Sequence, residues 1–192
     1  VNPNKTILIQ MMNKTRKATI LFALLMQCLV MRSQQVQRMF MGCSFGDKME
    51  VVLDSLQSRG IKVVACKDAL VIDAAKKPIT YNGVTWNYVC LNFFDNQFYT
   101  ISFTSDDTQK KRAEMKSAYA EMRANFARRY KDNMLYNLDE GLRIHDGFTG
   151  VFCHIDCVDE EGKRANPESG MMRIFLTYTD EKIDQVKRVL DE

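Results

Sequence analysis

Proline and histidine are scarce in this chain of 192 residues, and neither sign of charge dominates it. It contains only three prolines and is 46% hydrophobic, which excludes a disordered or low-complexity chain. Its two histidines leave few groups for general acid–base catalysis near neutral pH. The formal net charge of +3 is too small for a dedicated nucleic-acid-binding protein, which normally carries a clear basic excess.

The short motifs that mark common active sites are also missing. The sequence has no Gly-rich phosphate loop, no His-Glu-x-x-His, no Gly-x-Ser-x-Gly and no Cys-x-x-Cys. It therefore predicts no cofactor and favours no particular enzyme class.

The amino-terminal segment of the chain has the pattern of a secretory signal peptide. A basic run at residues 12–17 precedes an apolar stretch at 18–30, and a polar segment begins near Ser33. Thirteen apolar residues are too few to cross a bilayer, which takes about 20. We expect residues 1–33 to be an upstream extension and signal peptide cleaved after Ser33, which would leave no transmembrane anchor in the mature form.

Export to the periplasm or beyond follows from this interpretation. Residues 1–33 hold five of the 27 basic residues and no acid, so the remaining 159 residues carry 22 basic and 24 acidic side chains, a net charge of −2. Two other interpretations stay open. Residues 25–28 resemble a bacterial lipoprotein box, although Gln27 stands where a small residue is expected, and the segment could instead be a buried helix.

Five of the six cysteines lie beyond Ser33, an odd number for an exported protein. At least one thiol must then be free or paired between chains. The density is too low for a scaffold built on disulfides, so a hydrophobic core must supply the stability.

Residues 34–192 show the pattern of one α+β domain. Helices are expected at 48–59, at 105–131 and after Thr179, and runs of strand-like residues stand between them. Consecutive strands joined by tight turns predict an antiparallel sheet packed by the long helix at 105–131. The order also suggests two helix-then-sheet units, 40–105 and 106–192. In the last helix, Ile183, Val186 and Leu190 are expected to face inward.

The hairpin at residues 84–104 provides the main candidate for a binding surface. Asp95-Asn96 suits a two-residue turn, which pairs Phe94 with Gln97 and places Cys90 opposite Ile101. In this register both faces of the hairpin are substantially apolar, unlike a sheet with one face in water. We expect the face to be either buried within the fold or open to a partner; its residues are Val89, Leu91, Phe93 and Phe98.

A second hairpin is predicted at residues 142–158, and it brings several polar side chains to one face. If Asp146 pairs with Val151, then His145, His154 and Asp156 lie on one outer face, and Cys153 and Cys157 face the core. The three polar residues are the candidates for a metal or catalytic site. A flat strand face does not by itself bring three ligands within the roughly 2.0–2.2 Å that zinc needs.

The segments at 40–53, 81–86 and 93–99 resemble the style of small exported domains of Bacteroidetes-type bacteria, which begin Gly-x-x-Phe-Gly before a short helix and an antiparallel sheet. The order of elements is more distantly similar to the BamE/SmpA-like and β-lactamase-inhibitor-protein group. That resemblance implies an exported module that binds proteins in or beyond the cell envelope. Cys43 departs from the pattern, standing where an aliphatic residue is expected, and no functional residue is carried over.

The sequence as a whole favours an exported, non-enzymatic module that binds an envelope or extracellular protein or a peptide, with no nucleic-acid partner. A small hydrolase or metal-dependent enzyme, and a carrier of an apolar ligand between the sheet and the long helix, remain the alternatives. The oligomeric state and the identity of the partner do not follow from the sequence.

Overall fold

The computed structural model describes residues 35–74, 79–105, 112–130, 134–138, 141–158, 163 and 173–191. They belong to one compact unit, Gln35–Glu192. The predicted signal peptide and its cleavage site at Ser33 lie outside the described residues. Across the described part the fold is mixed α/β, with three helices and antiparallel sheets, as the sequence predicted.

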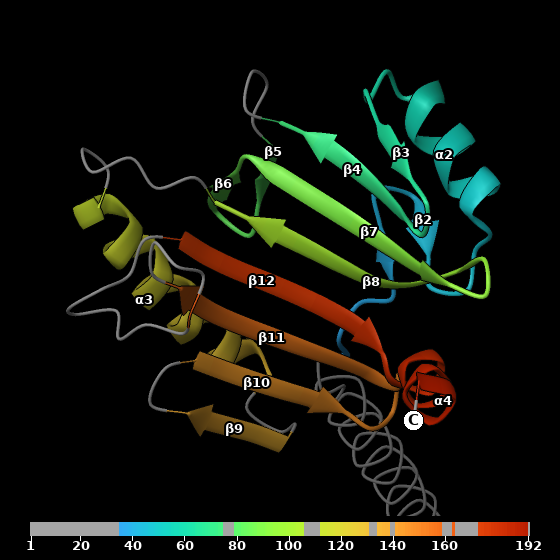
Figure 1. The fold of residues 1–192 in the computed structure, drawn as a ribbon. Coiled ribbons are helices and arrows are strands. Elements are labelled where there is room, and N and C mark those ends of the chain that lie inside the picture. Colours follow the sequence, from blue (N-terminus) through green and yellow to red (C-terminus); the bar gives the residue numbers. More distant parts are fainter. Residues whose placement is uncertain are drawn as a thin grey trace, which may run out of the picture. The chain divides into compact units, whose positions relative to one another are not determined.

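An eight-stranded sheet forms the centre of the fold (Figure 1). Every pair of neighbours in it is antiparallel. In spatial order the strands are β3 (Val64–Cys66), β4 (Ala69–Asp73), β7 (Tyr88–Phe94), β8 (Gln97–Thr104), β12 (Arg173–Asp180), β11 (Val151–Val158), β10 (Gly141–Asp146) and β9 (Met134–Leu138). Pairing of β8 with β12 joins the strands of the two halves of the chain, so both halves share one sheet.

Two short hairpins accompany this sheet: β1 (Met39–Phe40) with β2 (Cys43–Ser44), and β5 (Ile79–Tyr81) with β6 (Val84–Trp86). The strand expected at residues 84–94 is therefore broken at Asn87. The break lets β6 pair with β5 while β7 joins the large sheet. Trp86 is fully buried as a result, and its ring nitrogen donates a hydrogen bond to the carbonyl of Tyr81 at 3.0 Å.

Helix α2 (Met49–Ser58) begins and ends close to where the sequence places it. Gly60 follows at φ +71°, a backbone conformation that a Cβ atom disfavours, so glycine is well suited to end the helix there. The pattern Ser44-Phe45-Gly46-Asp47 predicts that the Ser44 side chain caps this helix, and that prediction is wrong. Ser44 lies in β2, where its N–H donates to Asp47 at 2.7 Å, and Lys48 precedes the helix without a side-chain cap.

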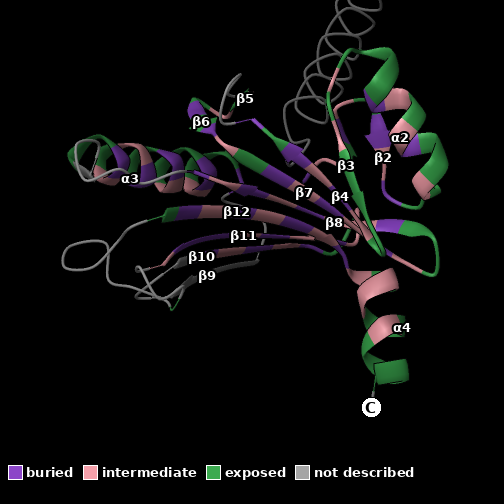
Figure 2. Ribbon diagram, turned by 45° about the horizontal axis from the view of Figure 1, so that its top comes forward, coloured by how far each residue is buried: buried purple, intermediate pink, exposed green. Residues whose placement is uncertain are grey.

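Helix α3 (Arg112–Arg129) is shorter than the helix expected at 105–131, and residues 106–111 lie outside the described residues. Its apolar stripe is buried in the same cluster as the inward side chains of the strands; the stripe comprises Met115, Tyr119, Met122, Phe126 and Tyr130. One face of the sheet is covered jointly by α3, α2 and the small hairpins, rather than by a single long helix (Figure 2).

Helix α4 (Glu181–Asp191) follows β12 directly and lies on the opposite side of the sheet from α3 (Figure 2). Asp180 caps it: one carboxylate oxygen accepts hydrogen bonds from the N–H groups of Lys182 at 3.0 Å and Ile183 at 3.1 Å. The pattern Thr179-Asp180-Glu181 predicts a cap at this position, which is confirmed, but the inward-facing stripe was not confirmed. Val186 is 54% exposed and Leu190 is 70% exposed.

Candidate functional site

The four residues predicted as a binding face lie in the core. Val89, Leu91 and Phe98 have no exposed surface, and Phe93 is 5% exposed. The hairpin face that they form is covered by the rest of the fold. The predicted binding surface is therefore corrected: these side chains stabilise the protein and are not accessible to a partner.

A β-bulge explains why the hairpin seemed apolar on both sides. The turn at Asp95-Asn96 has positive φ at both residues and pairs Phe94 with Gln97, as expected. Beyond Phe93–Phe98 the register shifts, so that Asn92 pairs with Thr100 and Tyr99 is the extra residue.

The shift changes which side chains share a face. Without it Ile101 would lie opposite Cys90; with it Ile101 lies opposite Leu91, and Phe103 lies opposite Val89. The hairpin then has one apolar, buried face and one polar face. The sequence signal was present in the spacing Phe98-x-x-Ile101-x-Phe103, which a regular strand cannot place on one side.

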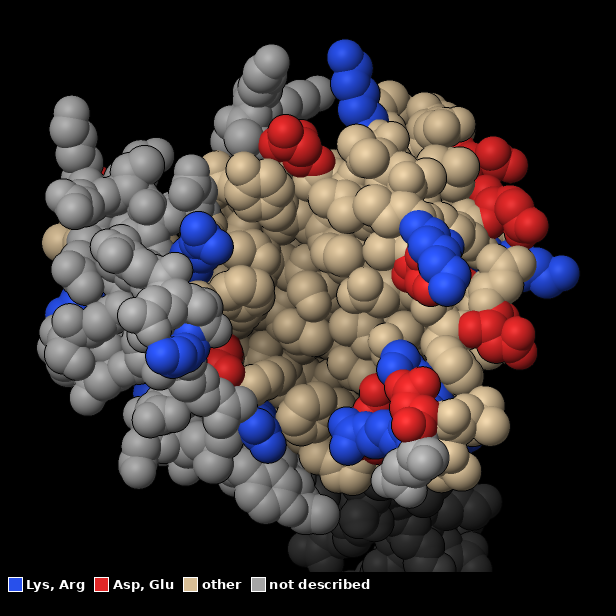
Figure 3. All heavy atoms as spheres, in the orientation of Figure 1, with Lys and Arg blue, Asp and Glu red and all other residues tan. Residues whose placement is uncertain are grey.

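The other face of the sheet is open to solvent, and we call it the open sheet face. Figure 3 looks onto it and shows an area without charged side chains in its middle. Its central residues are half-buried, as expected for side chains standing close together on a sheet; they are Val71, Cys90, Asn92, Thr100, Ser102, Phe175, Thr177 and Thr179.

Hydroxyl groups form a ladder across β8 and β12 in the centre of the open sheet face. The Thr100 and Thr179 hydroxyls lie 3.3 Å apart, and those of Ser102 and Thr177 lie 3.2 Å apart. Each hydroxyl can donate one hydrogen bond and accept two, so the ladder retains capacity for further partners. The face is thus suited to neutral polar groups.

Helix α4 borders the open sheet face at one end. Tyr99, the bulge residue, lies near its charged flank: burial raises the pKa of the Tyr99 hydroxyl, and Lys187 acts in the opposite direction. The flank also holds ion pairs within the helix, including Arg188 with Asp184 at 2.7 Å. The helix therefore meets the sheet with part of its charged side, and this leaves Val186, Val189 and Leu190 exposed.

The candidate metal residues occur in the predicted register but form separate pairs. Asp146 pairs with Val151 and Arg143 with His154, which confirms the hairpin. His154 contacts Asp156 at 3.4 Å, whereas His145 contacts Glu181 of α4 at 2.7 Å. Among the described residues no three His, Cys, Asp or Glu side chains form a group that could hold a metal ion.

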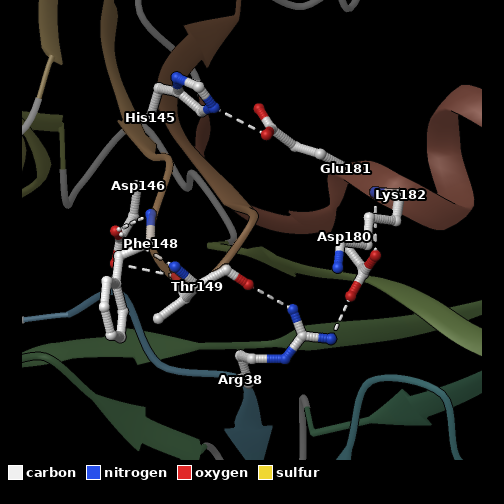
Figure 4. Close-up of polar contacts among 8 residues, drawn as sticks. All are labelled: Arg38, His145, Asp146, Phe148, Thr149, Asp180, Glu181 and Lys182. Carbon is white, nitrogen blue, oxygen red and sulfur yellow. Dashed lines mark hydrogen bonds and ion pairs between the residues drawn. The ribbon is translucent and has the colours of Figure 1, made fainter.

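A polar junction ties the start of the described chain to the β10–β11 turn and to α4 (Figure 4). One oxygen of the Asp146 carboxylate accepts from the N–H of Val36 at 2.7 Å and from the Thr149 hydroxyl at 2.8 Å; the other accepts from the N–H of Phe148 at 3.0 Å. Burial by itself raises the pKa of Asp146, but these hydrogen bonds outweigh it and hold the pKa below its ordinary value.

Arg38 completes this junction. Its guanidinium donates to the carbonyl of Thr149 at 2.6 Å and forms an ion pair with Asp180, the residue that caps α4. Asp180 is only 2% exposed, so the pair satisfies a buried carboxylate. The contacts are those of a structural joint, and no reactive group stands among them.

None of the five cysteines in the described region forms a disulfide bond. Cys43, Cys153 and Cys157 are buried, as expected for Cys153 and Cys157, and burial raises the pKa of Cys153. Cys90 is half-buried on the open sheet face, and Cys66 is exposed on the edge strand β3. The accessible thiol is therefore at the margin of the sheet.

The region between α3 and the sheet is where the sequence analysis placed the ligand of a possible apolar-ligand carrier. Met122 and Phe126 of α3 belong to one buried cluster with strand residues such as Leu176. These apolar side chains between α3 and the sheet therefore form part of the protein's own core.

Comparisons of the chain with models of protein families, with curated proteins and with solved structures found no match. The resemblance to exported helix-then-sheet domains therefore remains a prediction. None of the helices in the described residues has the length and apolar character needed to cross a membrane.

Proposed function

We propose that the protein is an exported, non-enzymatic binding module that recognises a protein or peptide through the open sheet face. The observation that carries this proposal is the division of the sheet into a buried apolar face and a solvent-facing one without central charges. Depletion of charged residues at the centre, with charges at the rim, is the pattern of protein interfaces.

The size of the open sheet face supports a macromolecular partner. Seven spacings of about 4.8 Å between the eight strands give a width of about 34 Å. A surface of this width and of strand length is comparable with the roughly 800 Å² that each partner contributes to a standard interface. The hydroxyl ladder adds hydrogen-bonding groups that an extended or irregular segment of the partner can use.

Export supports the choice of an envelope or extracellular partner, and it rests on the pattern of residues 12–33. The arrangement of the chain as two helix-then-sheet units is part of the same proposal. Each half supplies a helix followed by four strands of the shared sheet: α2 precedes β3, β4, β7 and β8, and α3 precedes β9 to β12.

The test places charge in the centre of the open sheet face. Ser102→Arg and Thr177→Arg each put a guanidinium where the face is uncharged, and we expect either to abolish capture of the partner from envelope extract. Gln57→Arg, an exposed position on α2, is the matched control and should retain it. Circular dichroism and thermal unfolding would check that the variants fold. Equal capture by all three variants and the unmodified protein would refute the proposed face.

A further inference from the structure

Arg143 of β10 lies on the side of the sheet that faces solvent. Its neighbours in β10, Leu142 and Ile144, are buried, so alternation along the strand directs Arg143 to the opposite face. It pairs with His154 of β11, and His154 pairs with Thr177 of the hydroxyl ladder. Arg143 therefore lies two strands away from the ladder, in the same row across the open sheet face.

The guanidinium of Arg143 is partly enclosed by the protein and has no acceptor there. Its Nε atom is buried without a hydrogen-bond partner, the one side-chain nitrogen or oxygen of this kind in the described part of the chain. Within the same ranges its two Nη nitrogens make no hydrogen bond or ion pair, and they are not buried, so they face solvent. An unpaired buried donor on a charged group is costly, which indicates a role other than stabilising the fold.

The titratable side chains beside Arg143 on this face have partners within the chain. His154 contacts Asp156 at 3.4 Å, and His145 contacts Glu181 at 2.7 Å. Asp156 is thereby engaged by a histidine rather than by Arg143. The charge of Arg143 is left without a counterion among the described residues.

Arg173, at the start of β12 on the same face, provides a comparison. It is exposed, so water satisfies its donors, and an ion pair at such a position is worth little. Arg143 is half-buried, and its Nε is sealed from water. An anion that meets a cation in such a partly enclosed place is screened less by solvent, so the attraction between the two is stronger.

We propose that Arg143 is the docking point for a carboxylate of the partner that binds the open sheet face. The two outward Nη nitrogens donate to the two carboxylate oxygens, a fork that arginine is well shaped to form. Thr177 and Ser102 of the ladder, in the same row, take neutral polar groups next to that carboxylate. This site rests on the proposed function and narrows it: the partner presents an acidic side chain or a free carboxyl terminus.

The balance of charge favours a carboxylate over a phosphate group. Of the described side chains in this row across the sheet, that of Arg143 alone carries a permanent positive charge, and Asp156 lies two residues from its pairing partner His154. A carboxylate carries one negative charge, which one guanidinium balances. A phosphate group carries about −1.5 to −2 at neutral pH, so an excess of negative charge would face Asp156.

NMR spectroscopy with acetate as the probe tests the site, on isotope-labelled protein purified in the form that the cell produces. Acetate replaces chloride at constant ionic strength, so that general screening stays the same. We expect the Nε–Hε resonance of Arg143 and the amide resonances of His154 and Thr177 to shift and to saturate. Inorganic phosphate at the same concentrations should bind more weakly than acetate.

Substitutions at Arg143 separate the fork from the charge. Arg143→Met keeps an apolar stem and removes the guanidinium, so the His154 and Thr177 amides should no longer respond to acetate. Arg143→Lys keeps the charge without the fork and should weaken acetate binding about fivefold. Arg173→Met is the matched control: it removes an exposed cation from the same face and should leave the response unchanged.

Thermal unfolding distinguishes this role from a structural one. Arg143→Met removes a sealed donor that has no partner, so its Tm should equal or exceed that of the unmodified protein. A clear fall in Tm would mean that Arg143 is retained to stabilise the fold, which contradicts the proposed role.

Three short peptides identify the source of the carboxylate. Acetyl-Ala-Glu-Ala-amide carries an acidic side chain, acetyl-Ala-Ala-Ala carries a free carboxyl terminus, and acetyl-Ala-Ala-Ala-amide carries neither. We expect one of the first two to bind more tightly than acetate, because its backbone adds hydrogen bonds to the ladder, and that peptide identifies the source. The third should cause no saturable shift at Arg143.

Four results would overturn the proposal: no saturable shift with acetate, an unchanged response in Arg143→Met, tighter binding of phosphate than of acetate, or acidic peptides that bind no better than the amidated one. Capture of the partner is read separately. If Ser102→Arg abolished capture while acetate caused no shift, the binding face would stand and the carboxylate site would not. If acetate bound at Arg143 while Ser102→Arg and Thr177→Arg captured the partner normally, the face itself would be refuted, and with it the docking role of Arg143.

Discussion

At the scale of single residues, Asp146 joins segments that are distant in the sequence. Its carboxylate accepts four hydrogen bonds, including one from the N–H of Val36, 110 residues away. The residue is 4% exposed, so these bonds replace water at a buried charge. Asp146 therefore fixes both the β10–β11 turn and the first described segment of the chain.

This arrangement predicts a pH dependence of stability. The pKa of Asp146 is lower in the folded protein than its ordinary value of 3.8. Its contribution is therefore fully present above that value and is lost as the pH falls through the folded pKa. We expect Asp146→Asn to lower the free energy of unfolding at pH 7 by about 1–3 kcal/mol and to reduce the loss of stability as the pH falls below 3.8, as measured by urea denaturation.

Asp95→Asn is the matched control, because Asp95 is exposed in the hairpin turn. It should leave both the stability at pH 7 and its acid dependence close to those of the unmodified protein. If Asp146→Asn showed the same acid dependence as the unmodified protein, Asp146 would not carry this part of the stability.

At the scale of elements, α4 is held at its beginning and is exposed over most of its remainder. Asp180 caps it and pairs with Arg38, and the carbonyl of Gly150 accepts from the N–H of Glu181 at 3.0 Å. None of its own side chains is buried. The stability of α4 therefore depends on its first turn.

Removing the cap should loosen α4 selectively. We expect Asp180→Ala to cost about 1–2 kcal/mol for the cap alone and to speed amide hydrogen exchange throughout residues 181–191. Arg38→Met removes the ion pair but keeps the capping oxygen, so exchange within α4 should change less. Unchanged exchange in α4 after Asp180→Ala would contradict the assigned role of the cap.

The exposed stripe of α4 predicts tolerance to polar residues. Leu190→Gln should change the free energy of unfolding by no more than about 0.5 kcal/mol, because Leu190 is 70% exposed. Leu176→Ala, in the fully buried part of β12, should cost about 2–5 kcal/mol in the same thermal or urea unfolding experiment. A large loss for Leu190→Gln would mean that another segment packs on the stripe.

At the scale of the whole molecule, the proposed export predicts the first residue of the mature protein. Cleavage after Ser33 leaves Gln34 as the first residue, which keeps Val36 and Arg38 available for their contacts with Asp146 and Asp180. Amino-terminal sequencing of the protein recovered from cells should read Gln34-Gln35-Val36. An intact chain carrying residues 18–30 would refute processing at this site, and a lipid on Cys28 would favour the lipoprotein interpretation.

Local patterns were sufficient for much of the fold. The turn at Asp95-Asn96 and the pairing of Asp146 with Val151 depend on residues close together in the sequence, and both were predicted correctly. The candidate site was less predictable. Its location depends on which face of the β7–β8 hairpin is buried, and the bulge at Tyr99 changed that assignment for Ile101 and the later residues of β8.

The sequence by itself determined the antiparallel character of the sheet, the apolar stripe of α3 and the resemblance of residues 12–33 to a signal peptide. Each of these is a periodicity or a composition within one segment. Only the tertiary structure decided that the two halves share one sheet through β8 and β12, that the predicted binding residues are core, and that α4 keeps its apolar stripe in solvent. These three features depend on which surfaces of the helices and strands pack against each other. Burial is a property of packed elements, and a single apolar pattern is equally compatible with a core and with an interface.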